Sequence, residues 1–336
     1  MAAELILILQ DFFAPLDQPP GNERPRLPGL ETLLARAQRW RLRQGWRGEL
    51  LRDYGGTGLE GLSAAGVVAG VTRGSTVEPS AGYWLATPVH YFAGLDRVQL
   101  HPAGLLSLPP ESQAALAADF RAVFGDDRWR LHATGRRELL LGGPALEAVG
   151  QDPARFLGAA LDDAQPQGAG AAELRRLAVE IEMWLHEHSV NRQRQASAEL
   201  PVSGLWFWGS EALPIAKTER TARAVLYGAD TFAGALWQRT DRPCESLPES
   251  AAALQNASTV PAPGTHVVLY PTADAEGVGG ALEHLERNWI VPALHALRSG
   301  TLSAVRLLAG DSAFRQRRID RLRFWRTRVP WQEALV

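Results

Sequence analysis

The chain has 336 residues, of which 46% are hydrophobic and 21% charged, with a formal net charge of -2 at pH 7. This length allows two domains, and the composition is ordinary for a globular protein. The near-neutral charge excludes a global attraction to nucleic acid or to an anionic membrane. The single cysteine, Cys244, excludes an intrachain disulfide and a cysteine-based zinc cluster.

The first apolar run, residues 4–10, is too short for a signal-peptide core or a membrane span, and no basic residue precedes it. No later segment reaches the roughly eighteen uncharged apolar residues that a transmembrane helix needs. We therefore expect a cytoplasmic protein that does not associate with membranes.

Three short apolar runs are typical of buried parallel strands: Leu5–Leu9, His266–Tyr270 and Ala304–Leu308. Between the second and the third, the apolar spacing over Ala281–Leu297 predicts a helix. A helix in that place would be the crossover of a right-handed βαβ unit. The pattern therefore predicts an α/β core with a mostly parallel sheet.

An acidic residue follows each of these strands: Asp11, Asp274 and Asp311. Ligands in open α/β sheets bind beyond the carboxyl ends of the strands, so three carboxylates there could hold a hard cation such as Mg²⁺ or Mn²⁺. The same acids could instead cap the helices or turns that follow the strands. The sequence leaves both interpretations open.

The middle of the chain predicts a second, smaller domain. After a helix over Leu30–Trp40, the pattern changes near Thr76 to a β-β-α-β-β order that is typical of an α+β domain with an antiparallel sheet. We expect residues 76–168 to form this inserted domain, and residues 1–75 and 169–336 to form the core. The five predicted elements are Gly82–Tyr91, Arg97–His101, Glu111–Phe124, Arg128–His132 and Glu138–Leu141.

A helix with an apolar face is predicted from Ala171, and its end carries His188, Asn191 and Arg194 at a three-residue spacing. Residues at this spacing share one face of a helix, so their polar ends could converge. An imidazole, an amide and a guanidinium can all donate hydrogen bonds, which suits an anionic oxygen ligand. Alternatively, these groups bind the last carbonyls of their own helix.

The C-terminal run Phe314–Arg328 is strongly basic and contains Phe324 and Trp325. Basic residues among aromatic ones can bind single-stranded nucleic acid. The near-neutral charge of the whole chain instead favours a solvated helix that packs Leu322 and Trp325 inward. We therefore do not expect a nucleic-acid partner.

The order of the central motifs resembles that of the archaeal-type cofactor-independent phosphoglycerate mutases of the alkaline-phosphatase-like metalloenzyme superfamily. In that family, a small α+β domain interrupts a metal-binding α/β core. A proteobacterial branch, the RpfE-type regulatory proteins, is similar in length and has the Pro-Val-His motif that ends here at His90. The matching segments are Tyr83–Thr87, Pro88–His90, Asp96-Arg97, Gly135–Leu140, Gln151–Pro153, His188–Arg194 and Leu205–Gly209.

Several positions depart from the mutase pattern. The family's first metal-binding aspartate is displaced to Asp11 or replaced by Gln10. Valine (Val278) and serine (Ser312) stand where the family has histidines after Asp274 and Asp311. We find no serine in the context of the family's nucleophile, and Trp208 replaces a strand arginine.

The resemblance therefore implies a catalytically degenerate, regulatory or ligand-binding relative that needs no cofactor. Its implied ligand is a small phosphorylated or carboxylate anion, and a protein partner is also compatible with a regulatory role. The implied ligand-binding residues are His90, Arg97, Arg137, His188, Asn191, Arg194 and Trp208. The first alternative is an active phosphoglycerate mutase or phosphohydrolase with a magnesium or manganese site remodelled from Asp11, Asp274 and Asp311. The second is a nucleic-acid-associated regulator.

Overall fold

The computed structural model describes residues 3–13, 25–56, 58–72, 80–94, 97–125, 128–213, 223–257, 264–272, 277–323 and 325–335. The chain forms two compact units. The first comprises Met1–Gly56, Ala216–Ala229 and Thr240–Val336, and the second comprises Thr57–Ile215 and Asp230–Arg239. No helix among the described residues combines the length and the apolar character needed to cross a membrane.

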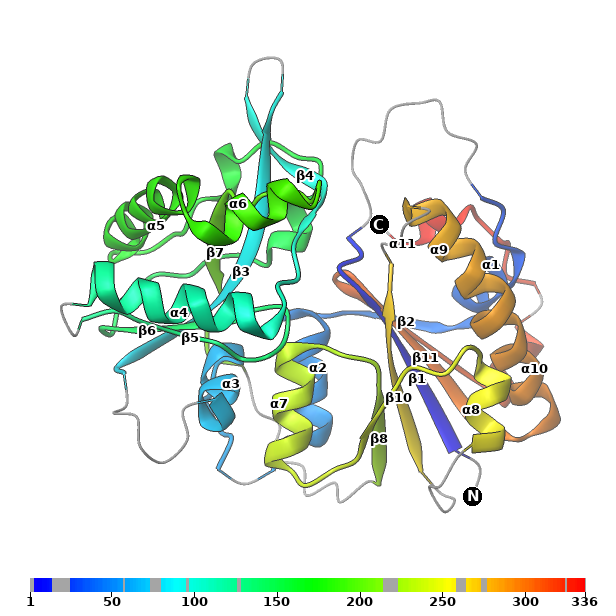
Figure 1. Cartoon of the computed structure of the whole chain (residues 1–336). Coiled ribbons are helices and arrows are strands. Elements are labelled where there is room, and N and C mark those ends of the chain that lie inside the picture. The colour runs from blue at the N-terminus through cyan, green and yellow to red at the C-terminus, as the bar shows by residue number, and fades with distance from the viewer. Residues whose placement is uncertain are drawn as a thin grey trace. The chain divides into compact units, whose positions relative to one another are not determined.

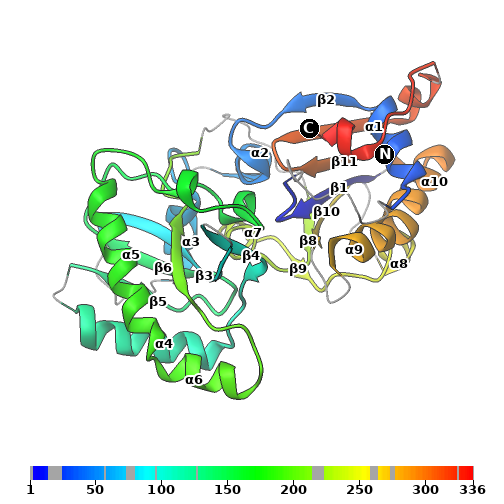
Figure 2. The ribbon, with the colours of Figure 1, turned by 90° about the horizontal axis from the view of Figure 1, so that it is seen from above.

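The first unit is built on a mixed sheet whose described part has seven strands. The three predicted parallel strands are confirmed, because β1 (Ala3–Gln10) pairs in parallel with both β10 (Thr265–Pro271) and β11 (Leu302–Ala309). Beyond β11, β12 (Ser312–Arg317) pairs antiparallel with β11, and β2 (Gln38–Arg41) pairs antiparallel with β12 at the edge of the sheet. Across the sheet, as Figure 2 shows, the order is β2 (Gln38–Arg41), β12 (Ser312–Arg317), β11 (Leu302–Ala309), β1 (Ala3–Gln10), β10 (Thr265–Pro271), β8 (Ala224–Tyr227) and β9 (Cys244–Glu245).

Helices cover one face of this sheet (Figure 1). Alternate residues of β1, including Leu5, Leu7 and Leu9, pack against them and form a core with Trp289. The helices are α1 (Pro28–Arg36), α8 (Ala251–Ala257), α9 (Gly277–Leu285), α10 (Val291–Ser299) and the short α11 (Trp331–Leu335).

The predicted crossover helix is present between β10 and β11, but a π-helical turn, Glu286–Ile290, divides it into α9 and α10. Pro292 lies in the first turn of α10, where it cannot donate a backbone hydrogen bond. The carboxylate of Glu286 accepts hydrogen bonds from the amides of Gly29 (2.5 Å) and Leu30 (2.9 Å) at the start of α1. The interrupted helix therefore supplies the acidic group that caps its neighbour.

The prediction of one helix over Leu30–Trp40 is wrong at its C-terminal end. Helix α1 ends at Arg36, Ala37 is extended, and β2 begins at Gln38. Residues 38–41 pair with β12, so sheet hydrogen bonds replace helical ones there. Arg323 and Arg326 donate to the carbonyl oxygens of Arg36 (3.3 Å) and Ala37 (3.1 Å), which satisfies acceptors at the end of the helix.

The prediction for the basic C-terminal segment is also wrong. Phe314 is buried in β12, and a short 3₁₀ helix, Arg318–Leu322, follows that strand instead of a long amphipathic helix. Leu322 and Trp325 do not pack inward, because they are 55% and 69% exposed. In β12, alternate side chains point to the two faces of the sheet, and Phe314 and Gln316 are buried on its inner face. This strand pattern replaces the helical periodicity that the sequence suggested.

The second unit contains an antiparallel sheet and confirms the predicted β-β-α-β-β order. Strand β3 (Gly82–Ala93) is central and pairs with β4 (Val98–Leu105), β6 (Leu139–Gly143) and β7 (Gly204–Trp208). Helix α5 (Ala171–His186) packs on this sheet through Leu174, Leu177 and Ile181. The remaining elements are α3 (Ala64–Thr72), α4 (Pro110–Phe124), β5 (Arg130–His132), α6 (Ser189–Ala196) and α7 (Thr231–Arg239).

This unit extends beyond the expected insertion 76–168 on both sides. Strand β7, from residues assigned to the core by sequence, pairs with β3 over Gly204–Trp208. Helix α3, which precedes residue 76, packs on β3 and on α7. The larger extent follows from pairings between segments that are distant in sequence.

A buried histidine in the first unit gives a pH-dependent prediction. His266 on β10 is 5% exposed, and its Nδ1 has no hydrogen-bond partner among the described residues. Burial lowers its pKa below the usual 6.5, so the unfolded chain takes up a proton near pH 6.5 that the folded chain does not. The free energy of unfolding is therefore expected to fall between pH 7.5 and 5.5, and to fall less in His266→Leu.

Urea denaturation at the two pH values measures this difference. His295→Leu, at an exposed position of α10, is the control and should keep the pH dependence of the parent. Equal pH dependence in His266→Leu and the parent would contradict the assignment.

Candidate functional site

The carboxyl ends of the parallel strands bring Asp11 and Asp311 to one edge of the first unit's sheet. Leu9 of β1 pairs with Ala309 of β11, and an aspartate follows each strand within two residues. Asp11 adopts a left-handed backbone conformation with φ of 54°, and the main-chain oxygen of Asp311 accepts from the amide of Leu42 at 2.7 Å. Asp274, the third acid of this predicted set, lies outside the described residues.

Other polar side chains at this edge are engaged by the protein. The amide nitrogen of Gln10 donates to the carbonyl of Ala229 at 3.1 Å, and the hydroxyl of Thr272 donates to the carbonyl of Gln10. Among the described residues, no three His, Cys, Asp or Glu side chains converge in a way that could hold a metal ion.

The side chain of Arg39 binds the serine that stands where the resemblance implies a metal-binding histidine. Ser312 follows Asp311 directly and is buried, and its hydroxyl accepts a hydrogen bond from the Nη2 of Arg39 at 3.2 Å. Arg39 comes from β2, and its guanidinium lies 5.5 Å from the centre of the Phe314 ring. Its positive charge lies at the edge that also carries Asp11 and Asp311, so it offsets part of their negative charge.

A groove continues from Arg39 along the surface between β12 and the C-terminal segment. Arg323 and Arg326 line it together with Phe314 and the acidic Glu333. Arg323 is already paired with Asp320 at 3.2 Å. Arg39 and Arg326 also donate hydrogen bonds, to the hydroxyl of Ser312 and to the carbonyl of Ala37, so the groove presents cationic side chains that already have protein partners.

The helix predicted to carry His188, Asn191 and Arg194 is broken. Helix α5 ends at His186, and α6 begins at Ser189, with His188 as its N-cap. The Nδ1 of His188 accepts from the amide of Val190 at 3.2 Å, and its Nε2 lies 3.1 Å from the carboxylate of Asp119. The three residues therefore do not form one polar face of one continuous helix, because capping by His188 starts a new helix.

Asn191 and Arg194 are bound to the backbone that leads into β7. Asn191 is 3% exposed and uses both amide hydrogens, toward the carbonyls of Leu185 (2.7 Å) and Val202 (2.9 Å). Its oxygen accepts from the amide of Val202 at 2.7 Å. Arg194 donates to the carbonyl of Leu200 at 2.7 Å and pairs with Glu199 at 2.9 Å. Through these hydrogen bonds, Asn191 connects the end of α5 to the segment that leads into β7.

His90 lies on β3 beside the same segment. Its Nδ1 is 2.9 Å from the carbonyl of Pro201 and 3.2 Å from the hydroxyl of Ser203. Burial lowers the pKa of His90, and the nearby His101 and Arg194 lower it further, against the opposing effect of the Pro201 carbonyl. The structure thus brings His90 and Arg194 into one neighbourhood, with His90 favoured in its neutral form.

The remaining predicted ligand residues have separate partners in the second unit. Arg97 pairs with Asp162 at 3.0 Å and is 58% exposed, and Arg137 pairs with the buried Glu138 at 2.9 Å. The indole of Trp208 donates to the hydroxyl of Thr87 at 2.8 Å, in the sheet. Arg97, Arg137 and Arg194 are therefore held by three different acids, and this arrangement does not present them together to one anion.

Sequence reasoning missed Arg39. Because all but one of the chain's basic residues are arginine, no single arginine stood out from the composition. The available signal was within Gln38–Arg41, where the aromatic Trp40 stands between two arginines. This alternation of polar and apolar residues predicts an edge strand and not the end of a helix.

Two solved structures are similar to this chain over most of its length. The PH0037 protein from Pyrococcus horikoshii is 12% identical, with a TM-score of 0.46, and the alignment covers 94% of this chain and 87% of that one. A cofactor-independent phosphoglycerate mutase from Thermoplasma acidophilum DSM 1728 is 13% identical, with a TM-score of 0.38 and coverage of 94% and 89%. No known protein family profile and no curated protein sequence matches the chain.

Proposed function

We propose that this protein is a catalytically degenerate relative of the phosphoglycerate mutases, with an alkaline-phosphatase-like core. It binds a small phosphorylated or carboxylate anion and acts as a regulatory protein of the RpfE type. The observation that carries the proposal is the hydrogen bond from Arg39 to Ser312 beside Asp311. Where the resemblance implies an imidazole that binds a metal, the chain has a hydroxyl occupied by a cationic side chain. The guanidinium supplies positive charge for an anion without a metal.

The first test separates binding from catalysis. We expect 2- and 3-phosphoglycerate to raise the melting temperature in the presence of EDTA, because a ligand at about 100 times its Kd stabilises by roughly 2.7 kcal/mol. We expect no turnover of either compound when Mg²⁺ or Mn²⁺ is added. Metal-dependent turnover would contradict the proposal.

The second test places the ligand at Arg39. Arg39→Gln should weaken binding about tenfold, which is the size expected for the loss of one charge-assisted hydrogen bond. Arg41→Gln, an equal change of charge on the exposed end of the same strand, should leave the affinity unchanged. Equal affinities for the parent and Arg39→Gln would exclude the carboxyl edge as the binding site.

A specific observation favours one competing function. Because β1 and β11 are adjacent and parallel, Asp11 and Asp311 follow at the same edge, as a remodelled magnesium or manganese site requires. In that case the protein would be a metal-dependent phosphotransferase or phosphohydrolase. Its signature would be turnover that EDTA abolishes and that Asp311→Asn reduces by at least a hundredfold, with folding retained.

A further inference from the structure

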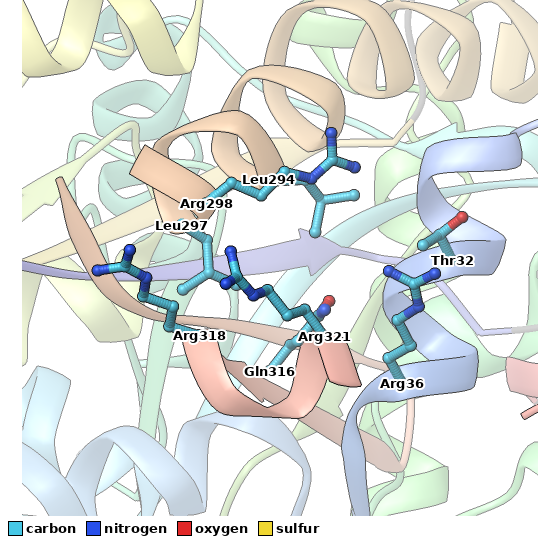
Figure 3. A pocket seen from close by; sticks show the side chains of 8 residues that line it. All are labelled: Thr32, Arg36, Leu294, Leu297, Arg298, Gln316, Arg318 and Arg321. Atoms are coloured by element: carbon cyan, nitrogen blue, oxygen red, sulfur yellow. The ribbon is translucent and has the colours of Figure 1, made fainter. Parts of the chain in front are cut away.

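A second cluster of arginines surrounds a small pocket on the helical face of the first unit. Figure 3 shows the side chains of Arg36, Arg298, Arg318 and Arg321 around Leu297 and Gln316. They come from separate elements: α1 supplies the first arginine, α10 the second, and the 3₁₀ helix after β12 the other two. Tertiary packing, not a run of basic sequence, therefore assembles this concentration of charge.

None of these four guanidinium groups has a carboxylate partner among the described residues, and no carboxylate is found among the side chains that line the pocket. Their neighbours in sequence differ in this respect. Arg317 and Arg323 both pair with Asp320, at 3.4 and 3.2 Å. The acid closest in sequence is thus already occupied, and the four pocket arginines keep their full donor capacity.

The floor of the pocket contains a buried polar group without a partner. Gln316 on β12 is 2% exposed, and its Oε1 makes no hydrogen bond to any described residue. Leaving such a group unsatisfied costs about 1–3 kcal/mol. The Oε1 is an acceptor, so the hydroxyl of a ligand would satisfy it, and an anionic oxygen of the same ligand could accept from the Nε2 of Gln316.

We infer that this pocket is a binding site for a small phosphate-bearing anion, such as hydrogen phosphate, pyrophosphate or a phosphate monoester. Guanidinium forks match the oxygen geometry of a phosphoryl group, and four of them match its multiple charge. Gln316 would bind a phosphoryl oxygen or the ligand's hydroxyl group. The enclosed space beside Leu297, about 10 Å³, admits about one water-sized group, so a ligand would enter it by one phosphoryl oxygen or hydroxyl and lie mostly among the exposed arginines.

This site is separate from the carboxyl edge. Along β12, Gln316 lies four residues beyond Ser312, which is about 13 Å at the rise of a β-strand. Ser312 pairs with Ala309 at the end of β11, whereas Gln316 pairs with Val305 in its middle. The inference therefore does not depend on Arg39 or on the acids that follow the parallel strands.

Isothermal titration of the full chain with pyrophosphate, in a chloride buffer of low ionic strength, tests the inference. We expect saturable binding, weakened at least tenfold in the double variant Arg298→Gln/Arg321→Gln, whose side chains are exposed and whose replacement should not affect folding. Arg43→Gln removes one exposed charge elsewhere in the same unit and should leave binding unchanged. No saturable binding, or equal affinity in the double variant, would overturn the inference.

Gln316→Glu provides an independent test, because it places an anion of nearly the same shape inside the pocket. If the arginines converge on this point, pyrophosphate binding is lost and the melting temperature is unchanged or higher. A lower melting temperature, or retained binding, would show that the guanidiniums do not reach the position and would overturn the assignment.

Two further binding measurements identify the class of ligand and the site that it occupies. A single-stranded oligonucleotide that binds more tightly than pyrophosphate, and loses binding in the same double variant, would overturn the assignment to a small anion. Measured in the Arg39→Gln background, the double variant Arg298→Gln/Arg321→Gln should still weaken pyrophosphate binding at least tenfold. Failure of the pocket can thereby be told apart from failure of the proposed function at the carboxyl edge.

Discussion

Replacing Arg306 by methionine is expected to lower the free energy of unfolding by about 3–5 kcal/mol at pH 7. Arg306 lies on β11, on the face of the sheet opposite the main helices, and is 6% exposed. Its Nη1 is 2.5 Å from Asp53 and 3.5 Å from Glu49, both on α2 (Gly45–Tyr54), and its Nη2 is 3.4 Å from Glu4. The guanidinium therefore neutralises acids from two elements at once.

The cost arises from the acids that the substitution leaves behind. Burial already raises the pKa of Glu49, despite the opposing charges of Arg52 and Arg306, so its ionised form is costly even in the parent. For Arg306 itself, burial would lower the pKa, but the charges of Glu4 and Asp53 outweigh it and raise the value. Without the cation, the carboxylates would remain in a poorly solvated place, and methionine would replace only the packing of the stem.

Urea denaturation of the variant at pH 7 and pH 5 measures the effect and its cause. Loss of Arg306 raises the folded-state pKa values of the acids, so protonation of the folded protein relieves the defect and the destabilisation should shrink toward pH 5. Arg315→Met is the matched control. Arg315 pairs with the same Glu4 at 3.2 Å from the neighbouring strand, but it is 41% exposed, so its loss should cost less than about 1 kcal/mol. Equal costs for the two variants would contradict the role of burial.

Replacing Asn191 by leucine is expected to lower the free energy of unfolding by about 3 kcal/mol. Leucine matches the shape of asparagine closely, but it leaves the buried carbonyls of Leu185 and Val202 and the amide of Val202 without their side-chain partner. Each such unsatisfied group costs about 1–3 kcal/mol, offset in part by the apolar side chain. The connection between α5 and β7 should loosen first, because these bonds join its two ends.

Hydrogen exchange and urea denaturation check this prediction together. Gln193→Leu, on the exposed side of the same helix α6, should change the free energy of unfolding by less than about 0.5 kcal/mol. In Asn191→Leu, the amides of β7 should exchange faster than those of β1, which lies in the other unit. A stable variant with unchanged exchange in β7 would show that water replaces the lost hydrogen bonds.

Local sequence patterns determined much of the fold. Uninterrupted apolar runs gave β1, β10 and β11 because strands buried on both faces need apolar residues at every position. The same patterns indicated the antiparallel unit and its helix, since the change of period from two to 3.6 is a local signal. The acids after the parallel strands followed from these assignments, and Asp11 and Asp311 lie at one edge as the topology requires.

Local patterns failed where a polar side chain could serve either a ligand or the protein itself. His188, Asn191 and Arg194 have the right chemistry for an anion, and only the structure shows that a helix cap and a strand entry use them. Helix α1 likewise ends early because β12, whose Ser312 lies 273 residues after Arg39, offers Gln38–Arg41 a strand to pair with.

The sequence by itself determined the architecture of this protein, because strand burial and helix amphipathicity are encoded within a few neighbouring residues. Only the tertiary structure decided which cations are committed to the fold and which remain available to a ligand. Arg306 and Arg298 are equivalent in composition, yet one neutralises buried acids and the other lines an open pocket. The difference arises from partners that are far away in sequence, because electrostatic pairing depends on distance in space.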